Sequence, residues 1–500
     1  MDKWSGMAGE IPVLTEDLQT NTQTLQNMIG TNPDVVLRRL IIRDVAKEAT
    51  MIYIEGLVDK REIHEQILMP LMKPGANNTE GNIENKQVKQ WLITEAIPVS
   101  TVQPVQRVEE CMQAIFAGNT VLLVQGIAEA FVIGTSNWET RPVEEPITEA
   151  LIRGPREGFV ESIRKNTAII RRKIKDPNLV FLPYKVGRRS QKDLYVVYIK
   201  EIANQALVDE VKSRIERIDI DAVEESGYVE QLIEENYLSP FPQTQNTERP
   251  DRVVQALLEG RVAILLDGTP FVLLAPVTFP MLMSSPEDYY ERWIPGSLIR
   301  LLRYIAVFLS LFLPALYISF ISYNHGMIPT KLAISISASR EGVPFPSIVE
   351  AFIMEVTVEI LREAGIRLPK PVGQAIGIVG ALVIGQAAVE AGIVSPITVI
   401  VVSLTAISSF SFPQYSAAIA IRIARFGMMI AASFLGLFGV ILLSIFLIAH
   451  LVKLKSFGVS YLAPFAPIYL HDWKDGLIRL PFFTLRKRTR ITKPKDSTRR

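Results

Sequence analysis

Apolar positions follow two different patterns along this chain, with a change near residue 297. Before that point, short apolar runs of strand length alternate with charged stretches of helical spacing, which is typical of α/β proteins. After it the apolar runs are much longer, and about 20 apolar residues in a helix suffice to cross the hydrocarbon core of a bilayer. The pattern predicts an α/β soluble N-terminal region followed by an α-helical polytopic membrane domain.

The N-terminal part contains an internal repeat. The segments "QAIFAGNTVLLVQG" (residues 113–126) and "QALLEGRVAILLDG" (residues 255–268) share Gln-Ala, a glycine five residues after the glutamine and a second glycine eight residues later. The strand-like and helical patterns upstream, residues 51–67 and 196–215, repeat in the same order. Such repetition indicates two copies of one structural unit. We predict a flexible polar tail and two similar cytoplasmic α/β subdomains, at 1–30, 31–155 and 156–290.

Ordinary turn chemistry accounts for the glycines of both copies, since a helix cap and a tight hairpin both favour glycine. Neither strand is followed by GxGxxG or GxxxxGK[ST], the motifs of dinucleotide and phosphate sites. The histidines form no HExxH pair and GxSxG does not occur. We therefore expect no enzymatic activity, no catalytic residues, no cofactor and no metal. The four histidines are His64, His325, His450 and His471.

The C-terminal part predicts four membrane-spanning helices. The first has no charge after Arg303 and contains Pro314, which is expected to kink it. The second is rich in glycine, which allows close packing of helices in a bundle. The four predicted transmembrane helices are residues 296–322, 371–394, 395–412 and 427–452, and a basic tail follows at 453–500.

Charge follows the same division and predicts an orientation. Residues 1–297 hold 43 acids and 32 bases (net −11), whereas residues 298–500 hold 9 acids and 21 bases (net +12). Bases collect on the cytoplasmic side of membrane proteins, so the basic tail and the N-terminal subdomains are expected there together. That arrangement requires an even number of crossings. The absence of an apolar signal segment and the single cysteine, Cys111, agree with a reducing cytoplasm.

One basic segment, residues 154–177, carries seven bases in a region that is net acidic. Pairing with the surrounding acids is therefore favoured over binding to nucleic acid or anionic lipid. We expect no nucleic-acid partner.

An acidic amphipathic helix at residues 346–365 interrupts the apolar pattern. Glu355, Glu359, Arg362 and Glu363 fall within about 100° of the helical circumference. Because carboxylates are costly in lipid, this stripe should face water or a partner. The helix lies flat at the interface, pairs its charges with nearby bases, or lines an aqueous path; in a ring of copies it would attract cations. The candidate pore or vestibule residues are Glu350, Glu355, Glu359, Arg362 and Glu363.

The glycine-rich helix at 371–394 offers a candidate gate, because a narrow hydrophobic constriction closes a pore by dewetting. The alternative is that its glycines only pack helices together. The gate candidates are Gln374, Val379, Leu382 and Gln386, with Val379 at the constriction.

Three strings resemble the A subunits of GerA-type spore germinant receptors: "GPREGF" (residues 154–159), "SASREGVPFPSIVEAF" and its continuation (residues 337–396), and "SYLAPFAP" (residues 460–467). The resemblance extends from about residue 35 to residue 485. It implies a multi-pass subunit in the inner membrane of the bacterial spore, beside a transporter-like, nutrient-binding B subunit and a lipoprotein C subunit.

The resemblance further implies a homo-oligomer, a pentamer, that forms a nutrient-gated channel and releases monovalent cations to begin germination. Two alternatives stay open. One is a non-conducting scaffold or signal-coupling subunit. The other is a secondary transporter, whose midplane breaks would come from Pro314, Gly377 and Pro413.

Overall fold

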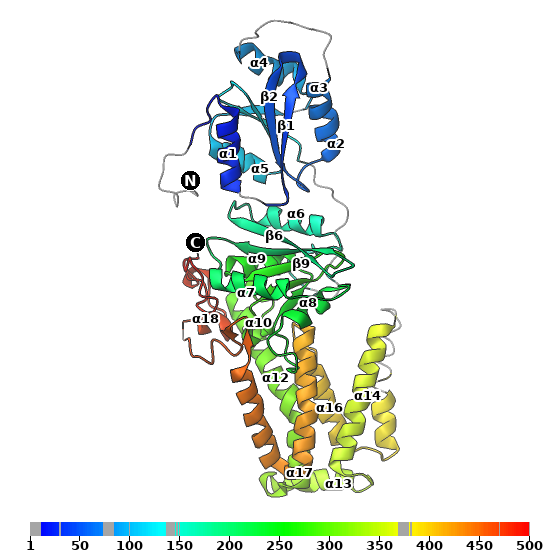
Figure 1. Ribbon diagram of the computed structural model, residues 1–500. Coiled ribbons are helices and arrows are strands. Elements are labelled where there is room, and N and C mark those ends of the chain that lie inside the picture. The colour runs from blue at the N-terminus through cyan, green and yellow to red at the C-terminus, as the bar shows by residue number, and fades with distance from the viewer. Residues whose placement is uncertain are drawn as a thin grey trace.

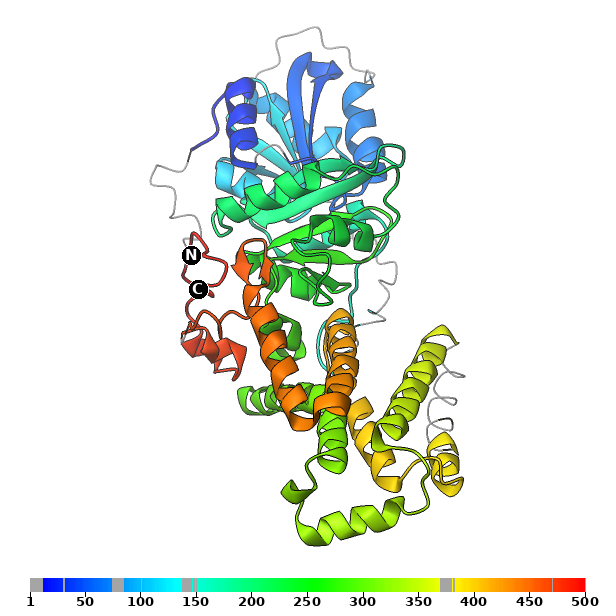
Figure 2. The ribbon, with the colours of Figure 1, turned by 60° about the horizontal axis from the view of Figure 1, so that its bottom comes forward.

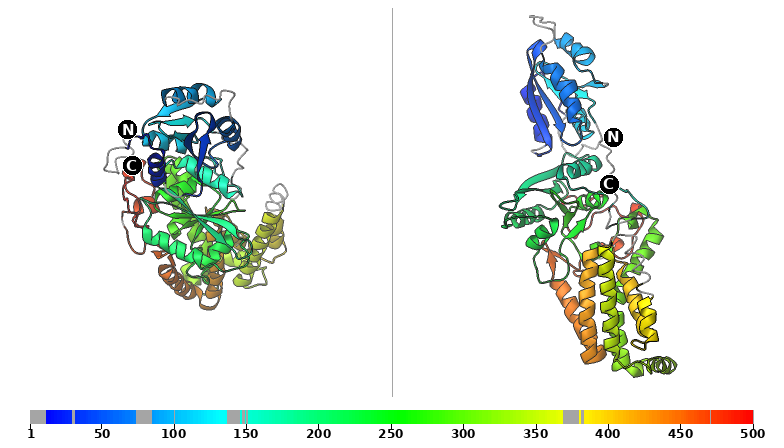
Figure 3. Two further views of the ribbon diagram at one scale, coloured as in Figure 1. Left: turned by 45° about the horizontal axis from the view of Figure 1, so that its top comes forward. Right: turned by 90° about the vertical axis from the view of Figure 1, so that its right-hand side faces the viewer.

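The computed structural model describes residues 12–29, 32–73, 85–99, 101–136, 146, 149, 151–368, 380, 383–469 and 471–499. Two α/β subdomains lie one above the other, and a group of long helices extends below the second (Figure 1). Figure 3 shows from two further directions that the second subdomain lies between the first and the helices. The expected fold class, α/β subdomains followed by a helical domain, is confirmed.

The first subdomain is built on an antiparallel five-stranded sheet in the order β1-β2-β4-β5-β3. Apolar residues of α1 (Leu18–Ile29) and α5 (Val108–Phe116) form the core on one face, and those of shorter helices form it on the other. The strands are β1 Val35–Ile42, β2 Lys47–Ile54, β3 Val102–Val105, β4 Thr120–Val124 and β5 Ala130–Ile133. The shorter helices are α2 Lys60–Glu62, α3 Met69–Met72, α4 Asn85–Trp91 and two π-helical turns, Ile63–Leu68 and Leu92–Ala96.

Helix α1 differs from the flexible tail expected over residues 1–30. Leu18, Leu25 and Ile29 recur at helical spacing, and all three side chains are buried against the sheet. The many Asn, Gln and Thr residues between them made the segment look polar throughout, although one apolar stripe is enough to dock a helix.

The second subdomain repeats this plan, with the strand order β6-β7-β9-β10-β8. The repeated glycines have the predicted roles: Gly118 and Gly260 follow α5 and α9 with φ of +87° and +79°, and Gly126 and Gly268 turn the next hairpins with φ of +82° and +87°. The strands are β6 Leu179–Val186, β7 Lys192–Ile199, β8 Gln245–Thr247, β9 Val262–Leu266 and β10 Val272–Ala275. The helices are α6 Ile163–Lys173, α7 Gln205–Glu216, α8 Ser226–Ile233 and α9 Pro250–Leu258, followed by α10 Phe279–Met283 and α11 Glu287–Tyr290.

Helix α6 joins the two subdomains. It carries Arg171, whose Nε donates to Asp34 Oδ2 of the first subdomain at 2.8 Å in a fully buried position. The backbone amide of Phe181 donates to Asn32 Oδ1 at 2.9 Å beside it. The two copies are therefore held together by a buried polar contact as well as by apolar packing.

The helical part begins with α12 (Trp293–Ser322), which runs unbroken through Pro314 away from the second subdomain. After α13 (Thr330–Arg340) at the far end, α14 (Ser347–Arg367) returns, and helical residues 383–390 and α16 (Pro396–Ser409) make a further pair. The Ser322 and Ser347 hydroxyls, 2.7 Å apart, join α12 to α14 at the far end.

Helix α17 (Tyr415–Lys453) is a hairpin, whereas one transmembrane helix was expected over residues 427–452. Gly436 has a non-helical conformation (φ 60°, ψ −141°) that divides it into two arms. A Cβ on Gly439 would lie 2.2 Å from Ala431 O, and one on Gly427 would lie 3.6 Å from Leu443 Cδ2, so the arms run antiparallel. Figure 2 shows the two orange arms meeting at one end. Glycine adopts this left-handed backbone at little cost, which explains the reversal here.

The basic C-terminal region packs on the second subdomain. It contains β11 (Lys455–Ser456), β12 (Val459–Ser460) and α18 (Trp473–Gly476). Arg488 Nε donates to Leu258 O at 2.7 Å, and the amide of Lys495 donates to Ile202 O at 2.9 Å. The short 3-10 turns of the chain are Arg43–Val45, His325–Met327 and Phe482–Thr484.

Candidate functional site

The charged stripe of α14 faces two arginines on the first arm of α17. Arg425 Nη2 lies 2.9 Å from Glu355 Oε2 and 2.9 Å from Glu359 Oε1. Arg422 Nη1 donates to Glu359 Oε2 at 2.8 Å, and Arg362 Nη1 to Glu359 Oε1 at 3.3 Å. We call these five residues, Glu355, Glu359, Arg362, Arg422 and Arg425, the charge cluster.

Helical spacing explains why these side chains meet. Glu355, Glu359 and Arg362 stand four and three residues apart, which places them on one face of α14, and Arg422 and Arg425 are three apart on α17. Each arginine of the cluster lies near an aromatic ring. The guanidinium of Arg362 is 4.8 Å from the centre of the Phe410 ring. The corresponding distances are 5.5 Å between Arg422 and Tyr415 and 5.7 Å between Arg425 and Phe426.

The centre of the charge cluster is buried, and some of its polar atoms have no hydrogen-bond partner among the described residues. The Arg425 and Glu355 side chains are 0% and 1% exposed. Within the described residues, Glu355 Oε1 and the Nε and Nη1 atoms of Arg425 are buried and have no hydrogen-bond partner. Three arginines face two glutamates, so one positive charge is not balanced inside the cluster. Ionisable groups among apolar helices are costly and generally mark functional positions, which makes this the candidate site.

Glu350 lies apart from the charge cluster, toward the far end of α14. Its side chain is fully buried and accepts from Arg340 Nη2 at 2.8 Å, from the Ser395 amide at 2.8 Å and from Thr398 Oγ1 at 2.9 Å. A carboxylate with this many donors is a structural link between α13, α14 and α16 rather than a free charge in a vestibule.

Glu363 also lies outside the charge cluster, on the surface of α14. It accepts from Arg367 Nε at 2.7 Å, and both side chains are more than half exposed. Exposed pairs of this kind contribute little to stability.

Of the five predicted vestibule residues, the structure therefore brings together Glu355, Glu359 and Arg362. Arg422 and Arg425 are their missing partners. Two bases three residues apart in an apolar run were the signal that could have identified them, because such charges need acids nearby. The observed contacts correspond to the second interpretation of the stripe, in which its charges pair with nearby bases.

The gate candidates Gln374, Val379 and Leu382 lie outside the described residues. Gln386 is exposed on helical residues 383–390, where its Nε2 donates to Glu390 Oε1 at 2.8 Å. Their assignment to a gate stays a prediction.

The outer surface of the bundle is strongly apolar. Among the described residues, α12 and α17 are the helices long and apolar enough to cross a membrane, with mean hydropathy of 2.2 and 2.6. Phe434, Phe438 and Phe446 of α17 are each more than 60% exposed. Aromatic side chains this exposed are expected to meet lipid or a partner protein.

Comparison with known proteins gives a match along almost the entire chain. The model of the Bacillus/Clostridium GerA spore germination protein family matches residues 23–491. Spore germination protein B1 of Bacillus subtilis (strain 168) is 44% identical over 97% of this chain and 99% of its own length. Spore germination protein GerLA of Bacillus cereus is 43% identical over 98% of each chain.

Two further comparisons concern a membrane protein and a solved structure. YfkQ of Bacillus subtilis (strain 168), an uncharacterized membrane protein, is 43% identical over 95% of this chain and 91% of its own. The crystal structure of the N-terminal domain of the A subunit of the Bacillus megaterium spore germinant receptor GerK3 is 34% identical, with a TM-score of 0.42, and covers 54% of this chain and 99% of that one. The family match spans both α/β subdomains and the helices that carry the charge cluster, so the resemblance is confirmed, and this chain belongs to the GerA family of spore germination proteins.

Proposed function

We propose that this chain is the A subunit of a germinant receptor in the inner membrane of the bacterial spore. In this proposal it forms a homo-oligomer, a pentamer, whose nutrient-gated channel releases monovalent cations. A transporter-like B subunit binds the nutrient and a lipoprotein C subunit completes the receptor. The observation that carries the proposal is the buried charge cluster, held between apolar helices in a spore germination protein.

The path of the chain supports a multi-pass arrangement with the subdomains in the cytoplasm. Gln414, before α17, donates from Nε2 to Asn246 O at 3.1 Å, and His450, near its end, lies with Nε2 2.9 Å from Ser239 Oγ. Asn246 and Ser239 both belong to the second subdomain, so the hairpin leaves that side and returns to it. Among the described residues, α12 and α17 are long and apolar enough to cross a membrane, and the two arms of α17 run in opposite directions, which supports more than one pass.

The charge cluster supports a mechanism for gating. While α14 packs on α17, Glu355 and Glu359 are neutralised by arginines and attract no cation. Movement of α14 away from α17 would uncover both carboxylates, and a ring of such carboxylates favours cations. Breaking a buried ion pair costs several kcal/mol, so nutrient binding at the partner subunit must supply that free energy.

Nutrient-triggered potassium release from spores tests the proposal. The strains carry the wild-type chain, Glu355→Gln/Glu359→Gln, or Val379→Ala, with all three subunits verified by immunoblot. The first variant should alter the rate or ion preference of release, and the second should leak without nutrient. Glu363→Gln, an exposed position on the same helix, is the matched control and should behave as wild type.

The same measurements separate the alternatives. Unchanged release in both variants would favour a scaffold or signal-coupling subunit. Saturable substrate uptake by this chain alone would favour a secondary transporter.

A further inference from the structure

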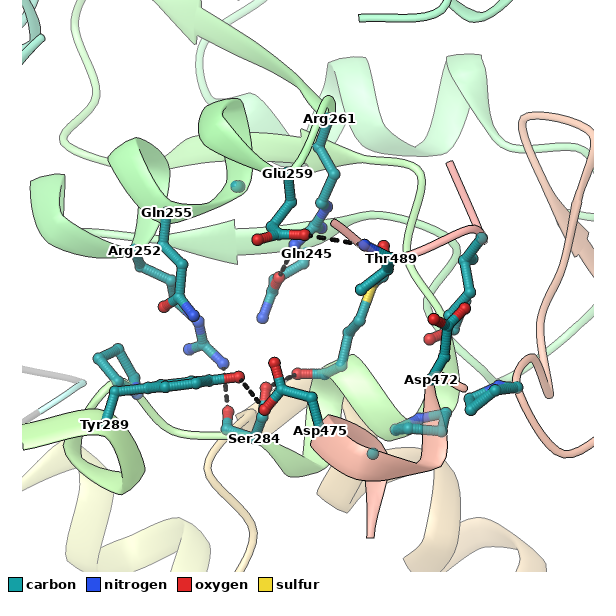
Figure 4. Close-up of a pocket in the computed structure, with 18 of the residues that line it drawn as sticks. Gln245, Arg252, Gln255, Glu259, Arg261, Ser284, Tyr289, Asp472, Asp475 and Thr489 are labelled. Carbon is teal, nitrogen blue, oxygen red and sulfur yellow. Dashed lines mark hydrogen bonds between the residues drawn. The ribbon is translucent and has the colours of Figure 1, made fainter. Parts of the chain in front are cut away.

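A polar pocket lies where the C-terminal region packs on the second subdomain (Figure 4). Its cavity has a volume of about 100 Å³. The walls come from β8, α9, the segment that follows β10, α11 and α18, which are far apart in the sequence.

Three buried donors in this pocket, Gln245 Nε2 and the hydroxyls of Thr278 and Thr489, lack a hydrogen-bond partner among the described residues. Gln245 is 1% exposed, and its Oε1 accepts from Arg261 Nη1 at 2.9 Å. A guanidinium can only donate, so this bond fixes the orientation of the amide and leaves Nε2 as an unused donor. Figure 4 shows that nitrogen directed into the cavity. The hydroxyl of Thr278, which is fully buried, is likewise without a partner there.

Arg261 supplies a positive charge that no acid within the described residues balances by a salt bridge. Its guanidinium donates to Pro276 O at 2.8 Å, to Gln245 Oε1 and to Leu274 O at 3.4 Å, all of them neutral acceptors. Burial lowers the pKa of Arg261 to about 9, which reflects the cost of holding this cation away from water.

The other charged groups of the pocket have partners. Arg252 Nη1 pairs with Glu149 Oε1 at 2.5 Å, Arg499 Nη2 lies 2.6 Å from Glu259 Oε1, and Asp475 accepts from the Tyr289 hydroxyl at 2.7 Å. Asp472 accepts from the amide of Arg490 at 3.0 Å and lies 3.3 Å from a ring nitrogen of His471. The pocket therefore still offers neutral hydrogen-bond donors, among them Gln245 Nε2 and the Thr278 hydroxyl, beside the Arg261 cation that no acid within the described residues balances.

We propose that this pocket binds a small oxyanion, a carboxylate or a phosphate, with Gln245 Nε2 and the Thr278 hydroxyl donating to its oxygens and Arg261 balancing its charge. A water-sized group needs about 10–15 Å³ of such space, so the cavity has room for about seven non-hydrogen atoms. Inorganic phosphate and short carboxylates are within that size.

Binding there would stabilise the contact between the C-terminal region and the second subdomain, because the ligand occupies a site that both must form. It would also act on the start of α12, since Arg300 Nη1 lies 3.5 Å from Asp475 Oδ1 and Arg300 Nε lies 3.2 Å from Asp288 Oδ2. The inference does not depend on the channel proposal, because it concerns a site outside the bundle.

Equilibrium dialysis of the purified full-length chain against radiolabelled phosphate and, separately, propionate tests the site. Saturable binding of phosphate alone assigns a phosphate site, and binding of propionate assigns a carboxylate site. Thr278→Val removes only an unpartnered hydroxyl, so it should weaken binding by about tenfold while leaving the melting temperature unchanged or higher.

Gln245→Glu is the second test variant. It keeps the shape of the side chain and places a carboxylate beside Arg261, so it should abolish anion binding and raise the melting temperature of the ligand-free chain. Gln19→Leu, at an exposed position of α1, is the control and should bind as wild type. Absence of saturable binding of both anions at millimolar concentration, or binding that survives both pocket variants, would overturn the proposal.

Discussion

Arg425 of α17 and Glu355 of α14 form an ion pair of 2.9 Å in which both side chains are almost completely buried. The two residues are separated by the whole of α16 in sequence, and their contact fixes α14 against the first arm of the hairpin. A buried pair of this kind contributes little relative to apolar residues of equal size, but leaving one member alone is strongly unfavourable. The effect of either residue on the free energy of unfolding therefore depends on whether the other is present.

A double-mutant cycle on this pair should show strong coupling. Glu355→Gln leaves the Arg425 charge buried with less compensation, and Arg425→Met does the same to Glu355, so each single change should destabilise the chain by about 3–5 kcal/mol. The double variant should recover much of that loss. Thermal unfolding of the purified chain in detergent measures all three, with Glu363→Gln as an exposed control within about 0.5 kcal/mol of wild type. Additive losses would contradict the prediction.

The parts of the fold that follow from local pattern were predictable. The duplicated glycine spacing alone indicates two copies, because turns and helix caps constrain residues that are close along the chain. The spacing of Glu355, Glu359 and Arg362 indicated a shared face for the same reason. Their pairing with Arg422 and Arg425 was not predictable, since the helical pattern says nothing about which other helix lies opposite.

The hairpin at Gly436 was also not predictable from the sequence. A long apolar run with several glycines has the same composition whether it crosses straight or turns back, and the reversal depends on one backbone conformation. Likewise, the few apolar residues of α1 were outweighed by polar neighbours in any average over the segment. In both cases a single position or stripe decides the structure.

Replacement of Gly436 by alanine should disrupt the hairpin. Its φ of +60° disfavours any side chain, and the added Cβ would lie 2.8 Å from the Cβ of Tyr323. Gly427→Ala is the matched control on the same helix, because its Cβ would meet only Leu443 Cδ2 at 3.6 Å. Chain levels in spore membranes, measured by immunoblot, should fall for Gly436→Ala and remain near wild type for Gly427→Ala. Equal levels in both would argue against a required turn.

The tip of the hairpin and the C-terminal region should lie on opposite sides of the membrane. Cys111 is buried, so single cysteines introduced elsewhere can be labelled selectively. In sealed vesicles with a known orientation, an impermeant maleimide should label Leu435→Cys from the side opposite to that which labels Ser497→Cys. Labelling of both from one side would mean that α17 crosses the bilayer once and does not return.

Stability of the second subdomain should depend on pH through Glu230. Burial raises the pKa of Glu230 to about 7, helped by the nearby Glu234 and Glu225 carboxylates and opposed by the hydrogen bond from Thr244. Since the folded state holds this proton more tightly than the unfolded chain, the contribution is complete below the unfolded pKa of about 4.5 and is lost as the pH rises through about 7.

Glu230→Gln removes that titration. It should exceed wild type in stability by up to about 3 kcal/mol near pH 8 and match it near pH 4, as measured by thermal unfolding across that range. Glu216→Gln, exposed on α7, should follow the wild-type pH profile.

The buried contact between subdomains should be worth far more than its exposed counterparts. Arg171 and Asp34 are 0% and 7% exposed, whereas Arg188 and Asp219, which also pair through two hydrogen bonds, are 70% and 60% exposed. Asp34→Asn leaves the Arg171 charge enclosed and should cost about 3–5 kcal/mol, while Asp219→Asn should cost less than about 1 kcal/mol. Because Arg171 of α6 pairs with Asp34 of the first subdomain, Asp34→Asn should also increase cleavage between the subdomains in limited proteolysis. If the two variants unfold at the same temperature and are cut at the same rate, apolar packing alone holds the two copies together.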